Sequence, residues 1–404
     1  MGKAKNVLVL TTWSYGSGLI QSSTLPYLKI IHNISPHSTL YLLTQENERW
    51  SIERKKELQQ ELSAYNIVVI PQQYHRFGFK KLIFSVVQFL ELYWIVLSKK
   101  VSHIHAFCTP AGATGYILSL LSGRKLVIDS YEPHAESMIE TQTWSKESGA
   151  FKLLWWLEKK QTSRADYCIA AAKGMEEYAK RKYGITLDHF GVRPACVDLD
   201  RFLFDKSQRD KIRKQLGWED KYVCVYAGKF GGIYLDQEVF DFFKVAFEYW
   251  GDRFRVLLLT NNSEDEIVSW MEKAHLPENI IHWEAISYTQ MPAYLSAADF
   301  AITPVKPVPS KKYCTPIKDG EYWAIGLPVV ITKDISDDSE IIRNYNAGYV
   351  INQLNMEEYL NAIKKIEELL TEENGQLRSR IRRIAEQYRH YSIAFNEYSK
   401  IYHE

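Results

Sequence analysis

The sequence predicts an α/β protein with two domains, each built on a parallel β-sheet that has helices on both faces. Short apolar runs alternate with amphipathic runs along the chain, which is the pattern of parallel sheets covered by helices. A chain of 404 residues is too long for one hydrophobic core and suits two domains. A linker-like stretch, residues 193–202, separates two halves in which the alternation starts anew.

In the first half, the expected strands are short runs rich in β-branched and aromatic residues. They are Val7–Thr11, Thr39–Thr44, Ile67–Ile70, His103–Cys108, Lys125–Asp129, Tyr167–Ala171 and Phe190–Val192. Ile67–Ile70 is continuously apolar, as expected of a strand that is covered on both faces. Helices are expected between these strands, among them residues 51–64, 113–121, 152–164 and 176–182.

One of these helices, Leu82–Leu97, is the most membrane-like segment of the chain. Pairs of lysines bracket it, but it contains Gln88 and Glu91 and is shorter than the ~20 residues that a membrane span needs. We interpret it as a buried helix. Contact with a membrane surface remains the alternative.

In the second half, strands and helices again alternate. We expect strands at Tyr222–Ala227, Phe254–Thr260, Ile280–Trp283, Phe300–Ile302, Val329–Thr332 and Tyr349–Ile351. Helices are expected at residues 207–216, 237–249, 265–274, 290–298, 338–344, 356–371 and 376–401. The last of these is predicted as a single long amphipathic helix.

Composition and charge narrow the function classes. Apolar residues make up 46% of the chain and charged residues 25%, as in a soluble globular protein. The net charge of +1 argues against nucleic acid as the main partner. Five cysteines are scattered singly, without a C-x-x-C pair, and no signal peptide fits before the first strand. We therefore expect a cytoplasmic protein, with any membrane contact at the inner face.

The stretch from Tyr313 to Val330 reads as a loop, a short helix and a buried strand. Thr315 and Pro316 are expected to begin the helix, with the Thr315 hydroxyl as its cap. Lys318 and Glu321 lie three residues apart and so share one side of the helix. A lysine at a helix N-terminus suits a diphosphate, and a carboxylate one turn later can accept both hydroxyls of a ribose. The alternative is a solvated Lys–Glu pair on a surface helix.

A second candidate site is the loop that follows the strand at Tyr222. Its glycines, Gly228, Gly231 and Gly232, would free backbone amides for phosphate oxygens, and the Lys229 ammonium would add charge. The loop lacks the G-K-S/T ending of a P-loop, so ATP hydrolysis is not implied.

Two loops of the first half are further candidates, because ligands in parallel sheets bind at the carboxyl ends of strands. Gly16 and Gly18 follow the first strand and would allow close approach to an anion, although a tight turn without a ligand explains them nearly as well. After the fifth strand, Asp129, Glu132, His134 and Glu136 offer groups for acid–base chemistry. A polar loop that caps the next helix is the equal alternative.

These motifs, in this order, resemble the retaining GT-B glycosyltransferases of the large group 4 family. The residues that carry the resemblance read Thr-Pro-x-Lys-x-x-Glu-Tyr-x-Ala-x-Gly-x-Pro-Val-Val from Thr315 to Val330. They follow the Gly/Lys strand-end loop and an Ala298-Asp299…Pro304 segment. The linker Arg193-Pro-Ala-Cys-Val-Asp198…Phe202 is similar to that family's Asn-Gly-Val-Asp…Phe segment. The resemblance is specific from about residue 190 to 350 and weak before it.

The resemblance implies the GT-B fold: two Rossmann-like doubly wound domains facing each other across a cleft. Their expected ranges are residues 1–201 for an acceptor domain and 202–385 for a nucleotide-sugar domain, with residues 386–404 as a helix that returns to the first domain.

The resemblance also implies roles for the candidate residues. Glu321 would hold the ribose, and Thr315, Lys318, Gly231 and Gly232 would lie at the donor. Lys229, His134 and Glu132 would be catalytic, with Lys229 beside the diphosphate and the other two facing the sugar. Glu284 and Ile286 would border the nucleobase, and Gly16 and Gly18 would contact substrate.

The implied reaction is transfer of a sugar from a nucleotide-diphosphate sugar, UDP- or GDP-linked, to a glycan or lipid-linked acceptor with retention. It implies a role in cell-surface polysaccharide or glycolipid synthesis, with peripheral membrane contact. Neither a cofactor nor a metal is expected, because helix dipoles and lysines balance the charge of the leaving diphosphate. No D-x-D cluster stands beside a strand, and Asp337-Asp338 is interpreted as a helix cap.

One departure from the family pattern leaves other functions open. The family's E-x7-E motif has an earlier glutamate that contacts the donor sugar, and Tyr313 stands at that place. A catalytically silent GT-B subunit that binds nucleotide or a partner protein is therefore an alternative. A UDP-sugar 2-epimerase is a third, although its set of catalytic carboxylates is not found here.

Overall fold

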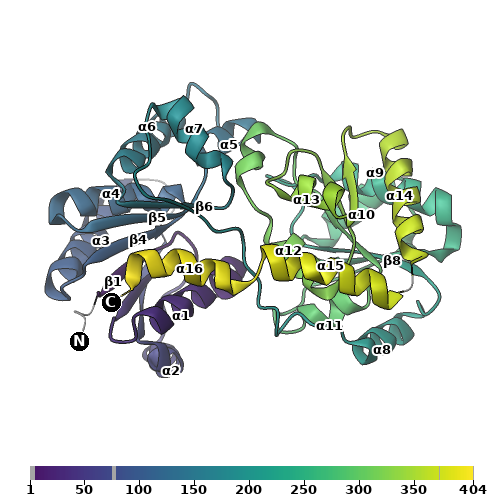
Figure 1. Cartoon of the computed structure of the whole chain (residues 1–404), viewed down its shortest axis with the longest axis horizontal. Helices are drawn as coiled ribbons and strands as arrows, with labels where there is room; N and C mark the ends of the chain where they lie inside the picture. The colour runs from purple at the N-terminus through teal and green to yellow at the C-terminus, as the bar shows by residue number, and fades with distance from the viewer. Residues whose placement is uncertain (1–4, 75–78, 373, 404) are drawn as a thin grey trace. The chain divides into compact units, whose positions relative to one another are not determined.

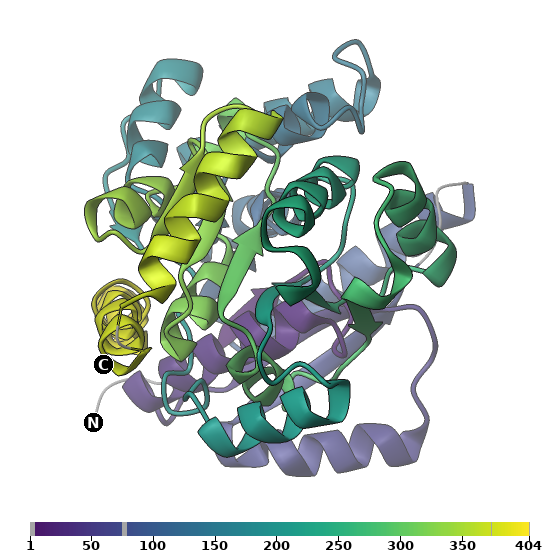
Figure 2. The ribbon, with the colours of Figure 1, turned by 90° about the vertical axis from the view of Figure 1, so that its right-hand side faces the viewer.

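The computed structural model describes residues 5–74, 79–372 and 374–403, which form two units. The first contains Met1–Pro194 together with Ser392–Glu404, and the second contains Ala195–Tyr391. The sequence placed these divisions at residues 201 and 385. Each unit has a parallel sheet with helices on both faces (Figure 1, Figure 2).

The sheet of the first unit has seven strands in the order β3-β2-β1-β4-β5-β6-β7, all paired in parallel. The strands are β1 (Val7–Leu10), β2 (Leu40–Glu46), β3 (Ile67–Gln73), β4 (His103–Phe107), β5 (Lys125–Tyr131), β6 (Tyr167–Ala170) and β7 (Phe190–Val192). The order reverses between β1 and β4, which makes the sheet doubly wound.

Helices cover both faces of this sheet (Figure 1). Because parallel crossovers are right-handed, the reversal of strand order places α3, α4, α6 and α7 on one face and α1 and α2 on the other. The helices are α1 (Leu25–Ile34), α2 (Ile52–Leu62), α3 (Phe79–Ser98), α4 (Thr109–Ser122), α5 (His134–Glu140), α6 (Gly149–Arg164), α7 (Gly174–Tyr183) and α16 (Tyr391–Tyr402).

The second unit has a six-stranded parallel sheet in the order β10-β9-β8-β11-β12-β13. The strands are β8 (Tyr222–Ala227), β9 (Phe254–Leu259), β10 (Ile281–Glu284), β11 (Phe300–Thr303), β12 (Val329–Thr332) and β13 (Gly348–Ile351). Its helices are α8 (Lys206–Leu216), α9 (Gln237–Trp250), α10 (Glu264–Lys273), α11 (Met291–Ser296), α12 (Ile317–Ile325), α13 (Asp338–Asn344), α14 (Met356–Leu370) and α15 (Asn374–Tyr388). The residues of the strands other than β10 are mostly buried, and they form one core with the inner faces of the helices.

The prediction of one long final helix is wrong, because the chain leaves helical geometry between α15 and α16. Arg389 lies at this break, and its side chain is only 2% exposed. Its guanidinium pairs with the buried carboxylate of Asp338, and its backbone carbonyl accepts a hydrogen bond from the Val197 amide at 2.8 Å. These two tertiary contacts hold the backbone at this point and end α15.

The interpretation of Leu82–Leu97 as a buried helix is correct for one side of the helix and wrong for the other. Leu92 and Val96 pack inside, whereas Leu90 and Trp94 are 58% and 64% exposed. No helix in the described ranges is both long and apolar enough to cross a membrane.

The helix α16 is held in the first unit by a buried polar network around Asp129, the residue at which β5 was expected to end. The Asp129 carboxylate pairs with Arg193 at 2.6 Å, lies 3.2 Å from His105 Nε2 and accepts the hydroxyl of Tyr398 at 2.6 Å. Burial alone would raise the pKa of the Asp129 carboxyl, but the Arg193 guanidinium and His105 hold that pKa below its usual value. The Asp129 carboxylate is therefore charged and has a structural role, because it connects residues that are far apart in the sequence.

Replacing Asp129 should destabilise the first unit strongly. In Asp129→Asn the Arg193 guanidinium loses its buried counter-charge, and a loss of about 3–5 kcal/mol in unfolding free energy is expected. Tyr398→Phe removes one hydrogen bond to the same carboxylate and should cost about 1–2 kcal/mol. Calorimetry of the full chain measures both. Equal, small shifts in the two variants would contradict the structural role of the ion pair.

Candidate nucleotide-sugar site

The helix α12 is tied to the carboxyl end of β8 by one buried hydrogen bond. The amide of Ala227, the last residue of β8, donates to the hydroxyl oxygen of Tyr322 at 2.9 Å. Tyr322 is fully buried, so this contact fixes α12 against the end of the strand from which the Gly/Lys loop departs. Two motifs that are about 90 residues apart in the chain are thus brought together at one edge of the sheet.

The predicted pairing of Lys318 and Glu321 on one side of the helix is confirmed. Lys318 Nζ lies 2.8 Å from Glu321 Oε2, and the side chains of the two residues are 30% and 0% exposed. The other carboxylate oxygen, Glu321 Oε1, is buried and has no hydrogen-bond partner among the described residues. An unpaired buried carboxylate oxygen is costly, so this atom is suited to accept a donor from a ligand.

The Gly/Lys loop has the backbone that its glycines predict. Gly231 and Gly232 have φ angles of 80° and 62°, in the left-handed region that favours glycine. The loop is held by the Tyr226 hydroxyl, which donates to the carbonyl of Lys229 at 2.6 Å, while the Lys229 side chain is exposed. Its far end is bonded to the segment after β11, where the Leu235 amide donates to the carbonyl of Pro304 at 2.8 Å.

Thr315 does not cap α12. The N-cap position is Pro316, without a side-chain cap, and the Thr315 hydroxyl lies 2.9 Å from the hydroxyl of Ser336 instead. The Thr315 hydroxyl thus bonds to a side chain from another part of the fold, and not to the backbone amides of α12 as the sequence pattern predicted. Thr315 is 8% exposed and connects the start of α12 to the loop after β12.

Glu284 is the last residue of β10, an edge strand of the same sheet, and Ile286 follows this strand. The Glu284 carboxylate lies 3.0 Å from His282 Nε2, and Ile286 packs against the core. β9 separates β10 from β8, and within the part of the chain that the structure describes no hydrogen bond links Glu284 or Ile286 to Lys318 or Glu321.

A buried carboxyl network lies under α12 and was missed by sequence reasoning. Asp319 accepts the Thr303 hydroxyl and shares a hydrogen bond with Asp338, which pairs with Arg389. Burial and the neighbouring Asp338 carboxylate raise the pKa of Asp319 well above its usual value, which favours the neutral form of Asp319. The interpretation of Asp337-Asp338 as a helix cap is wrong, because Asp337 makes no side-chain cap and Asp338 faces Arg389. Only the fold brings these residues together.

In the first unit, the structure brings two of the four acid–base candidates together and gives each of the other two different partners. Glu132 Oε1 and His134 Nδ1 lie 3.3 Å apart, and both side chains are about one quarter exposed. Asp129 is buried in the network described above. Glu136 accepts the Tyr178 hydroxyl at 2.6 Å and pairs with Lys182 at 2.8 Å. Only Glu132 and His134 therefore remain placed for chemistry.

The buried Glu158 of α6 supports the His134 loop from beneath. Its carboxyl accepts the Ala135 amide at 2.9 Å and the Tyr183 hydroxyl at 3.1 Å. Burial raises the pKa of Glu158 to about 7, and the hydrogen bond from Ala135 opposes this only in part.

Gly16 and Gly18 lack the geometry of an anion-binding loop. Both are exposed, neither has a left-handed φ, and a Cβ added to either would meet nothing within 4 Å. Their backbone does not require glycine, which favours the tight turn.

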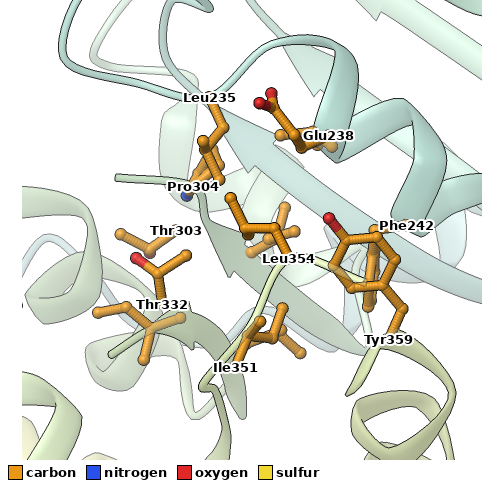
Figure 3. Close-up of a pocket in the computed structure, with 13 residues that line it drawn as sticks. Leu235, Glu238, Phe242, Thr303, Pro304, Thr332, Ile351, Leu354 and Tyr359 are labelled. Atoms are coloured by element: carbon orange, nitrogen blue, oxygen red, sulfur yellow. The ribbon is translucent and has the colours of Figure 1, made fainter. Parts of the chain in front are cut away.

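A small cavity of about 10 Å³ lies between β11–β13 and the helices α9 and α14 (Figure 3). Its wall is mostly apolar, with Glu238, Thr303 and Thr332 as polar neighbours. It has room for about one water, so it is a packing defect rather than a nucleotide site. Within the described residues, no group of three His, Cys, Asp or Glu is arranged to hold a metal ion.

The fold is of the GT-B class, and the second unit is similar in sequence to a family of glycosyltransferases. Residues 208–388 match the model of the family described as glycosyl transferases group 1, which is less than half of the chain but nearly all of the second unit. No curated protein sequence matches the chain significantly.

Several solved structures share this fold at low sequence identity. Anabaena Alr3699/HepE in complex with UDP is 16% identical, with a TM-score of 0.72 and 98% of each chain covered. Sucrose-phosphate synthase from Thermosynechococcus elongatus is 14% identical, with a TM-score of 0.73 and 98% of each chain covered. WaaG, a glycosyltransferase involved in lipopolysaccharide biosynthesis, is 14% identical, with a TM-score of 0.70 and coverage of 98% of this chain and 99% of that one. The predicted fold is thus confirmed.

The titration of Glu158 should make the stability of the first unit depend on pH. Because its pKa is higher in the fold than the ordinary 4.5, its contribution is complete below pH 4.5 and is lost as the pH rises through about 7. Glu158→Gln keeps the shape but cannot ionise. Between pH 5 and pH 8 the wild type should lose up to about 3 kcal/mol relative to this variant, as measured by chemical denaturation at each pH. Parallel pH profiles would refute the raised pKa.

Proposed function

We propose that the chain is a retaining glycosyltransferase that moves a sugar from a nucleotide-diphosphate sugar to a glycan or lipid-linked acceptor. The observation that carries this proposal is the fully buried Glu321, which has one oxygen paired with Lys318 and the other unpaired. A ribose has two neighbouring hydroxyls, and either can donate to such an oxygen. The position of Glu321, beside the end of β8 and its glycine-rich loop, is where a parallel sheet binds nucleotides.

In the proposed donor complex, the ammonium groups of Lys318 and Lys229 lie at the diphosphate, and Gly231 and Gly232 let the backbone approach it. The positive end of α12 adds to their field. Glu284 and Ile286 border the nucleobase, and Thr315 keeps the start of α12 in place through Ser336. Uridine is favoured as the base because HepE has been solved with UDP and UDP-glucose.

In the reaction, the bond between the anomeric carbon and the diphosphate oxygen breaks, and a bond to an acceptor hydroxyl forms while that hydroxyl loses its proton. The lysines and the helix end stabilise the negative charge that develops on the leaving diphosphate, and no metal is assigned to this step. We assign Glu132 and His134 as the groups of the first unit that contact the reacting sugar. A role in cell-surface polysaccharide or glycolipid synthesis on the cytoplasmic side, with peripheral membrane contact, completes the proposal.

Tyr313 favours a second candidate, a silent subunit that binds nucleotide without turnover. It stands where the family has a glutamate for the donor sugar, and its side chain is 9% exposed. Slow hydrolysis of a UDP-sugar without acceptor would exclude this candidate, whereas binding without hydrolysis or transfer would support it. Interconversion of UDP-sugars would indicate an epimerase instead.

Substitution of Glu321 should weaken nucleotide binding. Glu321→Gln removes the charged acceptor, and a hydrogen bond to a charged group contributes about 1.5–3 kcal/mol, so UDP should bind about 10- to 100-fold more weakly. Lys318→Ala should also weaken binding, whereas Lys273→Ala, at an exposed lysine on α10, should not. Calorimetric titration with UDP and GDP measures these effects. Unchanged affinity in Glu321→Gln would overturn the ribose assignment.

Substitution of His134 should reduce turnover without affecting nucleotide binding. A positioned acid–base group contributes about 10²- to 10⁴-fold, so His134→Ala should lower kcat by at least about 100-fold. The Kd for UDP should stay within about twofold of wild type. Full activity in this variant would remove His134 from the site, and the anomeric configuration of the product, read by NMR, tests retention.

A further inference from the structure

The outer surface of three neighbouring helices of the first unit is unusually apolar for a surface exposed to water. α3, α4 and α6 cover one face of the sheet (Figure 1). Their large exposed apolar side chains, between 41% and 64% exposed, are Phe84, Val86, Val87, Leu90, Trp94, Leu97, Ile117, Leu120, Leu121, Leu153 and Trp156. We call this surface the basic–apolar face. Isolated exposed apolar residues are ordinary, but a continuous group marks an interaction surface.

The apolar stripe of α3 follows from helix geometry. Val87, Leu90, Trp94 and Leu97 are spaced by three, four and three residues, so they share one side of the helix. The sheet side of α3 is satisfied by other residues, among them the buried Val96. The stripe is thus a second apolar side, which the core does not need.

The helices α3 and α6 both pack against α4. The Tyr93 hydroxyl reaches the carbonyl of Leu121 at 3.5 Å, which joins α3 to the end of α4. The Gln161 side chain donates to the carbonyl of Thr109 at 3.1 Å, which joins α6 to the start of α4. The three helices are therefore neighbours on this face of the sheet, and Leu120 of the middle helix, α4, is exposed.

The charges around this apolar surface are mostly positive. Exposed lysines on these helices and the turns next to them are Lys99, Lys100, Lys146, Lys152, Lys159 and Lys160. Among the described residues from 79 to 166, the exposed carboxylates are Glu91 and Glu147. On α6, Lys160 lies 5.8 Å from the Trp156 ring. Since the whole chain has a net charge of +1, positive charge is concentrated on this face.

We propose that the basic–apolar face docks on an anionic lipid bilayer, with Leu90, Trp94 and Trp156 inserted among the acyl chains and the lysines at the lipid phosphates. Tryptophan and lysine beside exposed aliphatic residues are the chemistry of a membrane interface. A second copy of the chain fits less well, because in a symmetric dimer the lysines would meet lysines. The inference deepens the proposed function, since it explains how a lipid-linked acceptor would be reached, but the surface stands independently of it.

The test uses the full chain and vesicles of phosphatidylcholine, with or without about 30% phosphatidylglycerol. The wild type should sediment with the anionic vesicles, and binding should fall as salt rises from about 0.1 to 0.5 M. Leu90→Ser with Trp94→Ser should weaken binding at least tenfold. Lys152→Ser with Lys159→Ser and Lys160→Ser should remove most of the preference for anionic lipid, at about fivefold per lysine.

The matched controls lie on α2, on the other face of the same sheet. Ile52→Ser changes an apolar side chain that is 80% exposed, and Lys56→Ser changes an exposed lysine. Neither should alter vesicle binding. The proposal is overturned if wild type ignores anionic vesicles at 0.1 M salt, if the controls lose as much as the α3 variant, or if light scattering shows a dimer that this variant dissociates. UDP affinity, measured in the same variants, should not change, so a failure here is distinct from a failure of the nucleotide assignment.

Discussion

The site of the second unit depends on one constraint: strands in a parallel sheet all end at the same edge. This edge gathers the loops after β8, β11 and β12, which the sequence separates by tens of residues. One buried contact, from the Ala227 amide to the Tyr322 hydroxyl, then fixes the helix that follows at that edge. Helical spacing then places Lys318 beside Glu321, because residues three apart lie on the same side of a helix.

What could be predicted from the sequence is what local geometry decides. The i, i+3 pairing of Lys318 with Glu321 and the left-handed glycines of the loop after β8 depend only on their neighbours, and the structure has both. The prediction that Thr315 caps α12 is wrong because the Thr315 hydroxyl is hydrogen-bonded to the hydroxyl of Ser336, a residue distant in the sequence. The break after α15 could not be foreseen, since it depends on Asp338, which is 51 residues before Arg389.

The same limit explains the errors in the first unit. Asp129, Glu132, His134 and Glu136 form one polar cluster in the sequence, and nothing local separates them. In the fold, the Asp129 carboxylate pairs with Arg193 and accepts a hydrogen bond from Tyr398, which lies 269 residues later in the chain. The hydrophobic pattern of α3 was likewise ambiguous, because a helix with two apolar sides reads as buried whichever side meets the core. Only the packing shows which side is left in water.

Buried carboxyls are present in both units, and they differ in their hydrogen-bond partners. This difference separates the carboxyls that stabilise the fold from the one that we propose binds a ligand. Glu158 has an amide and a hydroxyl as donors, and its raised pKa favours the neutral form. Asp319 accepts the Thr303 hydroxyl, and its pKa, raised by burial and by the neighbouring Asp338 carboxylate, also favours the neutral form. Glu321 has a lysine on one oxygen and no donor from the described residues on the other. Among the described residues, Asp319 and Asp338 also have one unpartnered oxygen each, but their carboxyls neighbour each other, whereas the partner of Glu321 is a lysine on its other oxygen. This difference is why we propose Glu321, rather than the two aspartates, as the acceptor for a ligand's hydroxyl.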